Sequence, residues 1–367
     1  MSAPRPLLHR VLAHPAEAAA LDDAGWHLLV GQARSAAVLG RTLSAVAARI
    51  GERALPPCAA HALTAERNLA AHRCACLRWE VEELARVLAP LGVPVILLKG
   101  AAYVIQGHDW AHWRHFGDID ILLPATTLPD AERLLAVNGW IHSKRDDYDQ
   151  AYYRRWMHEL PPLQHLLRGT ALDVHHTIVP RTARYRPPAE KLFENARGLP
   201  ADDRLATLSA SDQFLHAATH LFTEGEADMA LRNLVDLHDL LCSGSAQDAD
   251  GFAAALCERA ATLDLIAPLA LAARHLHRQL GSMAAAAVSA ELTRNKRIPA
   301  FNGALDWMFD ATFRGHHPSM RSRSLGSASA LLYLRGHWLR MPATLLAAHL
   351  GLKLLRRQYS DGRGTNC

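Results

Sequence analysis

The stretch RHFGDIDILL, residues 114–123, decides the fold, because two carboxylates interrupt a run that otherwise predicts a buried strand. Asp118 and Asp120 are two residues apart, and alternate side chains of a strand point to the same face of its sheet. Both carboxylates should therefore emerge side by side. Adjacent carboxylates repel each other and lose hydration when they are buried, and a divalent cation relieves that cost. Ligands that are all oxygen atoms favour Mg²⁺ or Mn²⁺.

The segments on either side of this stretch alternate between predicted strands and predicted helices. The run VPVILLKG at 93–100 is short and apolar and ends at a glycine, which is typical of a buried strand followed by a turn into a helix. The strands expected are 93–98, 119–123, 140–144, one or two within 151–167, and 171–179. The helices expected between them are 100–107 and 128–138, the second stopped by Gly139.

Both flanks of this αβ block have apolar residues at helical spacing. The helices expected there are 21–50, 64–91, 209–225, 229–244, 250–280 and 331–357. The pair Pro56 and Pro57 should break the first from the second, with Thr64 as the N-cap of the second. The fold class predicted is α+β, a mixed sheet with helices between two helical regions. The domains predicted are 1–91 (N-terminal helical region), 92–198 (catalytic core) and 199–367 (C-terminal helical domain).

Several short motifs occur in order along the αβ block. They are Lys99 and Gly100 in LLKG, Arg114, the group Gly117, Asp118 and Asp120, then Gly139, and finally Asp173 and His175 in ALDVHH. In this combination the chain resembles the nucleotidyltransferases of DNA polymerase β type. It is most similar to a bacterial group described only as nucleotidyltransferase family proteins. The resemblance covers about residues 93–179 and is weaker through the helical remainder.

The resemblance implies a minimal polymerase β-like catalytic core and three catalytic carboxylates. Asp118 and Asp120 align with the metal-binding pair, and Asp173 aligns with a third metal-binding carboxylate on a neighbouring strand. In such a site one Mg²⁺ or Mn²⁺ holds the triphosphate and the leaving pyrophosphate, and the other lowers the pKa of the acceptor hydroxyl. Asp173 would complete the second site and could receive the acceptor proton.

Five further residues are candidates for nucleotide binding by the same resemblance: Lys99, Gly100, Arg114, Gly117 and His175. Lys99 lies where a strand becomes a helix, and a helix N-terminus offers free N–H groups to a phosphate. Arg114 could neutralise phosphate or brace the carboxylates. His175 alternates with Asp173 on a predicted strand, so it should face the same side and either orient Asp173 or contact the nucleotide.

The implied activity is Mg²⁺-dependent transfer of a nucleoside monophosphate from an NTP, ATP or GTP, to a hydroxyl or phosphate acceptor. A small molecule or a peptide is favoured over nucleic acid, because no basic surface interleaved with aromatic residues is evident. Phosphoryl transfer uses the same ion cradle and stays open. A degenerate nucleotide-binding or partner-binding protein also stays open, because Ala101 stands where the wider superfamily has serine or glycine.

Two histidines on a predicted helix allow a different interpretation. His216 and His220 are four residues apart, so they share one helix face and could bind zinc with Asp236 or Asp239 as a third ligand. The alternatives are a polar contact between helices or a wall of the nucleotide cleft. His158, in MHELPP, is a weaker candidate for a site residue.

Composition limits the setting of the protein. The chain has 367 residues, a net charge of +4 and 50% hydrophobic residues, which is ordinary for a soluble globular protein. Its six cysteines show no zinc spacing and are expected to be reduced thiols of a cytoplasmic protein. Neither a signal peptide nor an apolar run of about 18 residues is evident, so no membrane span is expected.

The C-terminal end is basic. Residues 314–363 hold nine Lys and Arg against the single acid Asp361. A helix at 342–357, with Lys353 and Arg356 near one end, could therefore lie on a membrane surface. A bundle helix with a charged last turn, or a solvated face, fits the same pattern.

Overall fold

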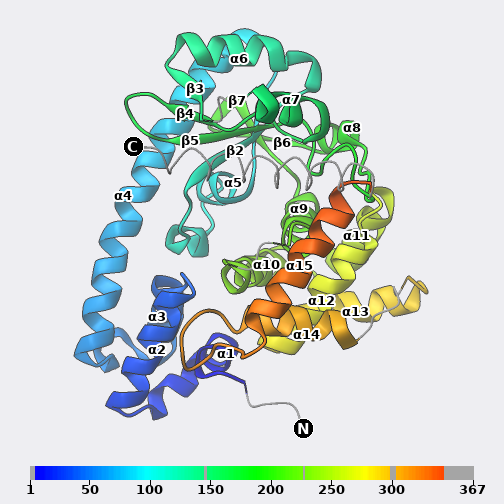
Figure 1. Cartoon of the computed structure of the whole chain (residues 1–367). Coiled ribbons are helices and arrows are strands. Elements are labelled where there is room, and N and C mark those ends of the chain that lie inside the picture. Colours follow the sequence, from blue (N-terminus) through cyan, green and yellow to red (C-terminus); the bar gives the residue numbers. More distant parts are fainter. Residues whose placement is uncertain (1–4, 144–146, 226–227, 298–302, 343–367) are drawn as a thin grey trace, which may run out of the picture.

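The computed structural model describes residues 5–143, 147–225, 228–297 and 303–342. Figure 1 shows a sheet at the top of the molecule, one long helix descending from it, and a group of C-terminal helices at the lower right. The predicted α+β class is confirmed, because one mixed sheet lies between two helical regions. The predicted helix 342–357 lies outside the described residues, except for Pro342.

The sheet has seven strands in the order β3-β4-β5-β2-β1-β7-β6. The strands are β1 Val95–Leu97, β2 Asp118–Leu122, β3 Trp140–His142, β4 Leu163–His165, β5 Ala171–His175, β6 Arg197–Leu199 and β7 Asp202–Thr207. Two pairs are parallel, β2 with β5 and β1 with β7, and the other neighbours are antiparallel. The strands therefore continue past residue 198, the end predicted for the αβ block, and the division into three domains stays a prediction.

The N-terminal helices lead into the sheet. They are α1 Leu7–Ala13, α2 Asp23–Ser35, α3 Leu39–Ile50 and α4 Pro57–Leu88. With 32 residues, α4 is about 48 Å long, and it contacts α2 and α3 at one end and α5 and α6 at the other. The helices between strands are α5 Lys99–Ile105, α6 Leu128–Val137, α7 Asp147–Trp156 and α8 Ala189–Glu194. Short 3₁₀ turns join several of these elements, among them η4 at Asp109–Trp113.

The C-terminal helices follow β7 directly. They are α9 Ala210–Thr223, α10 Ala230–Gly244, α11 Ala249–Thr262, α12 Ile266–Leu280, α13 Met283–Arg294, α14 Gly303–Phe313 and α15 Leu325–Arg340. Hydrogen bonds join them to the start of the chain: the ring of His9 bonds the carbonyl of Phe313 at 3.0 Å, and Gln32 donates to Ser319 at 2.8 Å. Within the described residues no helix combines the length and the apolar character that crossing a membrane requires.

Two segments predicted as single helices are each divided in two. The first helix is interrupted between α2 and α3, where Ala37 has a φ of +55°. The second is interrupted between α11 and α12, where Asp264 has a φ of +58°. Both residues are in the left-handed region, which a helix interior excludes. Because neither position is a glycine or a proline, the helical spacing of the sequence carried no sign of either break.

Other local predictions were wrong for identifiable reasons. The Pro56 and Pro57 pair begins α4, since a proline in the first turn lacks only an N–H that has no partner there, so the helix starts seven residues before Thr64. The segment 151–167, predicted to hold one or two strands, does hold one, β4, but it begins with the unpredicted helix α7, whose Arg154 bonds Glu132 of α6 at 2.8 Å. Strand β5 stops at His175 instead of 179.

Candidate active site

The three predicted catalytic aspartates lie on two adjacent strands. Strands β2 and β5 are parallel, and Asp120 is directly opposite Asp173 in their register. Paired residues of neighbouring strands are about 5 Å apart and face the same side, and Asp118 shares that side because it is two residues before Asp120. Asp120 is buried and Asp118 is exposed at the beginning of β2. The structure therefore brings the three carboxylates to one face of the sheet.

Asp120 is held by a lysine and a histidine. Lys99 donates to its Oδ1 at 3.2 Å and the Nε2 of His175 lies 3.0 Å from the same oxygen. Burial alone would raise the pKa of Asp120, but Lys99 and the hydrogen bond from His175 hold that pKa well below its ordinary value. His175 therefore contacts Asp120, whereas one of its predicted roles was to orient Asp173.

Lys99 reaches Asp120 from a strained backbone position. Its φ is +42°, which is uncommon for a residue with a side chain, and it opens α5 immediately after β1. Such strain costs about 1–3 kcal/mol and persists only where the surrounding structure imposes it, most often at functional sites. Two positions after Lys99, Ala101 is buried in the core, so no side chain from that position faces the carboxylates.

Asp173 is crowded by negative charge. Burial, and then the charge of Asp120, raises its pKa to about 6. Glu159 lies nearby on the segment that bridges to His175, and burial raises its pKa to about 7. Burial disfavours the charged form of both carboxyl groups, so a bound cation beside them would stabilise that form.

A second group of candidate ligands adjoins the aspartates. Within the described ranges, one set of three side chains has ligand atoms that all lie within 4.8 Å of one another, namely His158, Glu159 and His175. Asp118, Asp120 and Asp173 are more widely spread than this. The Nε2 of His175 is 3.5 Å from Glu159 and 3.0 Å from Asp120, so His175 links the two groups. Oxygen donors come from the aspartates and nitrogen donors from the histidines, which suits Mg²⁺ at the first group and Mn²⁺ at either.

Arg114 packs against Gly100 and forms an ion pair with a residue of α10. Its Nε donates to Asp236 of α10 at 2.7 Å, and a Cβ on Gly100 would collide with its guanidinium group. Burial opposes the charge of Arg114, but Asp236 raises its pKa. Gly100 therefore serves close packing of an arginine, which explains a glycine here without any direct contact to phosphate. Arg41 is a second buried partner of Asp236, at 3.5 Å.

A polar cavity of about 200 Å³ opens in front of Asp118 and Asp120. Its lining comes from the sheet, from α5 and from the helices α9 and α10: Lys99, Tyr103, Arg114, Asp118, Asp120, Ala217, His220, Asp228, Met229, Arg232, Asn233 and Asp236. Three cationic side chains, those of Lys99, Arg114 and Arg232, thus face two of the aspartates. An anionic group with a bound cation fits this distribution of charge.

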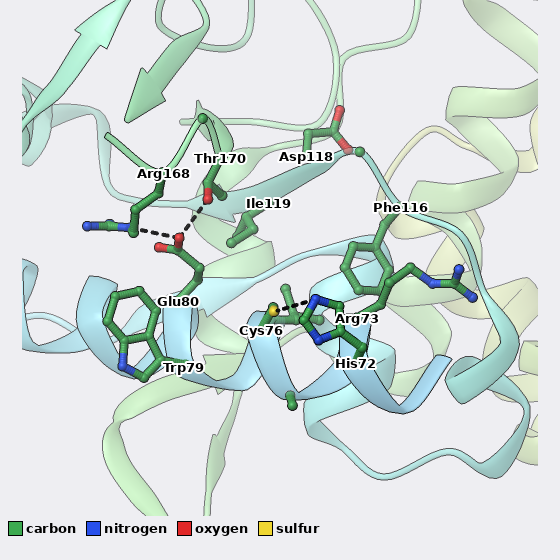
Figure 2. Close-up of a pocket in the computed structure, with 14 residues that line it drawn as sticks. His72, Arg73, Cys76, Trp79, Glu80, Phe116, Asp118, Ile119, Arg168 and Thr170 are labelled. Carbon is green, nitrogen blue, oxygen red and sulfur yellow. Dashed lines mark hydrogen bonds and ion pairs between the residues drawn. The ribbon is translucent and has the colours of Figure 1, made fainter. Parts of the chain in front are cut away.

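A second cavity of about 680 Å³ lies on the other side of Asp118, between α4 and the beginning of β2. Figure 2 shows that Ile119 points toward α4, whereas Asp118 points away from it. Gly117 and Asp118 stand at the rim, where both are exposed. Gly117 has open space where a Cβ would be, so nothing at this position separates the rim from solvent.

The zinc arrangement considered for α9 is not formed. His220 bonds Glu224 at 2.8 Å, and Asp236 is held by arginines instead of histidines. His216 is buried, and burial together with the charge of Lys99 holds its pKa well below the ordinary value. The alternative, a polar wall of the site, agrees with the place of His220 in the polar cavity.

Sequence reasoning missed three residues of this region. Glu159 follows His158 directly, and only the bridge to His175 brings it to the site. Arg232 and Asn233 enter from α10, more than a hundred residues after Asp118. The only available signal was the group of polar residues on the predicted helix 229–244, which marks a helix face without saying what that face meets.

A family model described as "Uncharacterised nucleotidyltransferase" matches residues 22–281. The match starts beside α2, includes every strand of the sheet and ends after α12. Neither a curated protein nor a solved structure matches the chain.

Proposed function

Because the chain belongs to this family of uncharacterised nucleotidyltransferases, we propose that it transfers a nucleoside monophosphate from an NTP to a hydroxyl or phosphate acceptor, with Mg²⁺ or Mn²⁺ as cofactor. The observation that carries the proposal is the register of β2 with β5, which sets Asp120 opposite Asp173 with Asp118 on the same face. Nucleotidyl transfer needs charge neutralisation and positioning more than it needs covalent chemistry by the protein, and this face supplies both.

The residues present fit a divalent cation. Asp118 is exposed at the beginning of β2, and burial, followed by the charge of Asp120, raises the pKa of Asp173, so both gain from a positive charge. Asp118, Asp120 and Asp173 would hold it. The chemistry that such a cation supplies when bound is neutralisation of the triphosphate and a lower pKa for the acceptor hydroxyl.

The protein's own side chains would bind the triphosphate and accept the proton. Lys99, Arg114 and Arg232 line the polar cavity, where they would stabilise the charge of the leaving pyrophosphate. Asp173, with a pKa of about 6, is close to the value that suits a proton acceptor at neutral pH. ATP and GTP are the first nucleotides to test, and the acceptor favoured is a small molecule or a peptide.

The decisive assay measures pyrophosphate released from each NTP with Mg²⁺ and a bacterial cell extract as the source of acceptor. We expect release that requires the metal and is lost in Asp118→Asn. This variant is cleaner than Asp120→Asn, because Asp118 is exposed while Asp120 is the buried partner of Lys99. Asp130→Asn, at an exposed position on α6, is the matched control.

The products separate the competing activities. Release of pyrophosphate identifies nucleotidyl transfer, whereas a nucleoside diphosphate without pyrophosphate identifies phosphoryl transfer by the same site. Calorimetry that detects no binding of any NTP in the presence of Mg²⁺ or Mn²⁺ would overturn the proposal.

A further inference from the structure

The cavity beside α4 has walls that are already in place. Glu80 of α4 accepts hydrogen bonds from Arg168 at 2.8 Å and from Thr170 at 2.6 Å, which ties α4 to the turn between β4 and β5 (Figure 2). The guanidinium of Arg168 also lies 5.1 Å from the ring centre of Trp79 and 5.5 Å from that of Trp140. The cavity is thus preformed, which reduces the entropy lost when a ligand binds.

The surface of this cavity suits an uncharged ligand with an apolar ring. Leu77, Trp79, Phe116 and Ile119 supply its apolar walls, and the side chain of Trp79 is 49% exposed although it is large and hydrophobic. The formal charges around it balance, since two arginines, Arg73 and Arg168, oppose two acids, Glu80 and Asp118. A volume of about 680 Å³ lies within the range of small-molecule sites.

The two cavities meet at Asp118, which lines both. In nucleotidyl transfer the attacking and leaving oxygens lie roughly in line on opposite sides of the reacting phosphorus. The polar cavity carries Lys99, Arg114 and Arg232, so it suits the leaving pyrophosphate. The apolar cavity opens past the exposed Gly117 at the beginning of β2, so a ligand bound there lies next to the same carboxylate.

We infer that the cavity between α4 and β2 is the acceptor site, and that the acceptor is an uncharged, largely apolar small alcohol or phenol. The inference rests on the proposed function and adds the class of acceptor to it. The acceptor oxygen forms a bond to the α-phosphorus, and the bond from that phosphorus to the pyrophosphate oxygen breaks. The hydroxyl proton passes to water, and pyrophosphate leaves with the electron pair of the broken bond.

The test uses 2-naphthol as the probe, because it is an uncharged aromatic alcohol at neutral pH, with 2-naphthoate as its anionic counterpart. Binding to the full chain is measured by calorimetry, first alone and then with Mn²⁺ and a non-hydrolysable ATP analogue at saturation. Cys76→Trp fills the cavity, since Cys76 lines it. Ala71→Trp is the matched control, because Ala71 is an exposed residue of the same helix outside the cavity.

We expect saturable binding of 2-naphthol that persists in the presence of the nucleotide and is at least tenfold tighter than binding of 2-naphthoate. Cys76→Trp should weaken 2-naphthol at least tenfold and leave the affinity for the ATP analogue within twofold, while Ala71→Trp changes neither. Absence of saturable 2-naphthol binding overturns the inference, and so does displacement of 2-naphthol by the nucleotide, which would make the cavity a site for the base. Failure of the ATP analogue to bind the wild-type protein would contradict the proposed function and not the assignment of the acceptor site.

Discussion

Asp212 in the C-terminal helices and Asp120 in the sheet are both buried carboxylates, yet their surroundings neutralise them differently. Asp212 is fully buried and accepts two hydrogen bonds from Arg259, at 2.6 and 2.9 Å, and a third from Asn195 at 3.0 Å. This bidentate pair matches one cation to one anion. Asp120 instead has Lys99 and His175 on one oxygen and lies opposite a second carboxylate, Asp173, which has no such partner among the described residues.

The difference separates a structural ion pair from a binding site. A carboxylate with a complete set of partners holds helices together and has nothing left to offer a ligand. Carboxylates in excess of their cations keep an unfavourable charge that an added cation or a proton removes. Burial, and then the charge of Asp120, raises the pKa of Asp173 to about 6, so its charged form is disfavoured where it lies.

The largest expected effect is on turnover at the sheet. Asp118→Asn should lower pyrophosphate release by about a thousandfold, about 4 kcal/mol, because charge stabilisation in the transition state is lost. Its thermal unfolding midpoint should stay within a few degrees of wild type, since the exposed side chain of Asp118 has no ion-pair partner among the described residues. Turnover equal to that of Asp130→Asn would remove Asp118 from the mechanism.

The reverse outcome is expected at the helical ion pair. Asp212→Asn should cost about 3 kcal/mol of unfolding free energy, because it leaves Arg259 without its charge partner. Urea unfolding followed by circular dichroism measures this loss. The affinity for Mn²⁺ of the folded variant should equal that of wild type, and a tenfold loss there would mean that the two carboxylate sites are not independent.

The pH dependence of metal binding should distinguish the two sites further. Asp173 has a raised pKa of about 6 and Glu159 one of about 7, so at lower pH a cation must displace a proton from the site. Affinity for Mn²⁺ should therefore fall by up to about tenfold per pH unit below pH 6 and level off above pH 7. Calorimetry from pH 5 to 8 tests this. Asp173→Asn should weaken binding and flatten the profile, whereas Asp212→Asn should reproduce the wild-type profile.

The smallest effect concerns the strained backbone that distinguishes the sheet site. Lys99 has a φ of +42°, a value that glycine adopts freely and alanine does not. Lys99→Gly should therefore unfold at a free energy about 1 kcal/mol higher than Lys99→Ala, although both lose the bond to Asp120. Equal stabilities would indicate that the strand-to-helix turn relaxes once the lysine is removed.

Much of the site follows from local pattern. The spacing of Asp118 and Asp120 placed two carboxylates on one strand face, and the strand predicted at 171–179 supplied Asp173. Strand β5 has the predicted start and ends earlier, at His175. Long-range partners were not accessible in the same way: Arg114 bonds Asp236, and no periodicity relates residues so far apart in the chain.

The sequence by itself determined the mixed αβ core and the helical flanks, because these depend on side-chain alternation and helical spacing over a few residues. The choice of Asp173 as a third carboxylate came from the family resemblance and stays a prediction. Only the tertiary structure decided which helices face the aspartates, because α9, α10 and α4 reach them through contacts between distant segments. The helix interruptions at Ala37 and Asp264 were also decided only by the tertiary structure, since tertiary packing can override the local preference for a continuous helix.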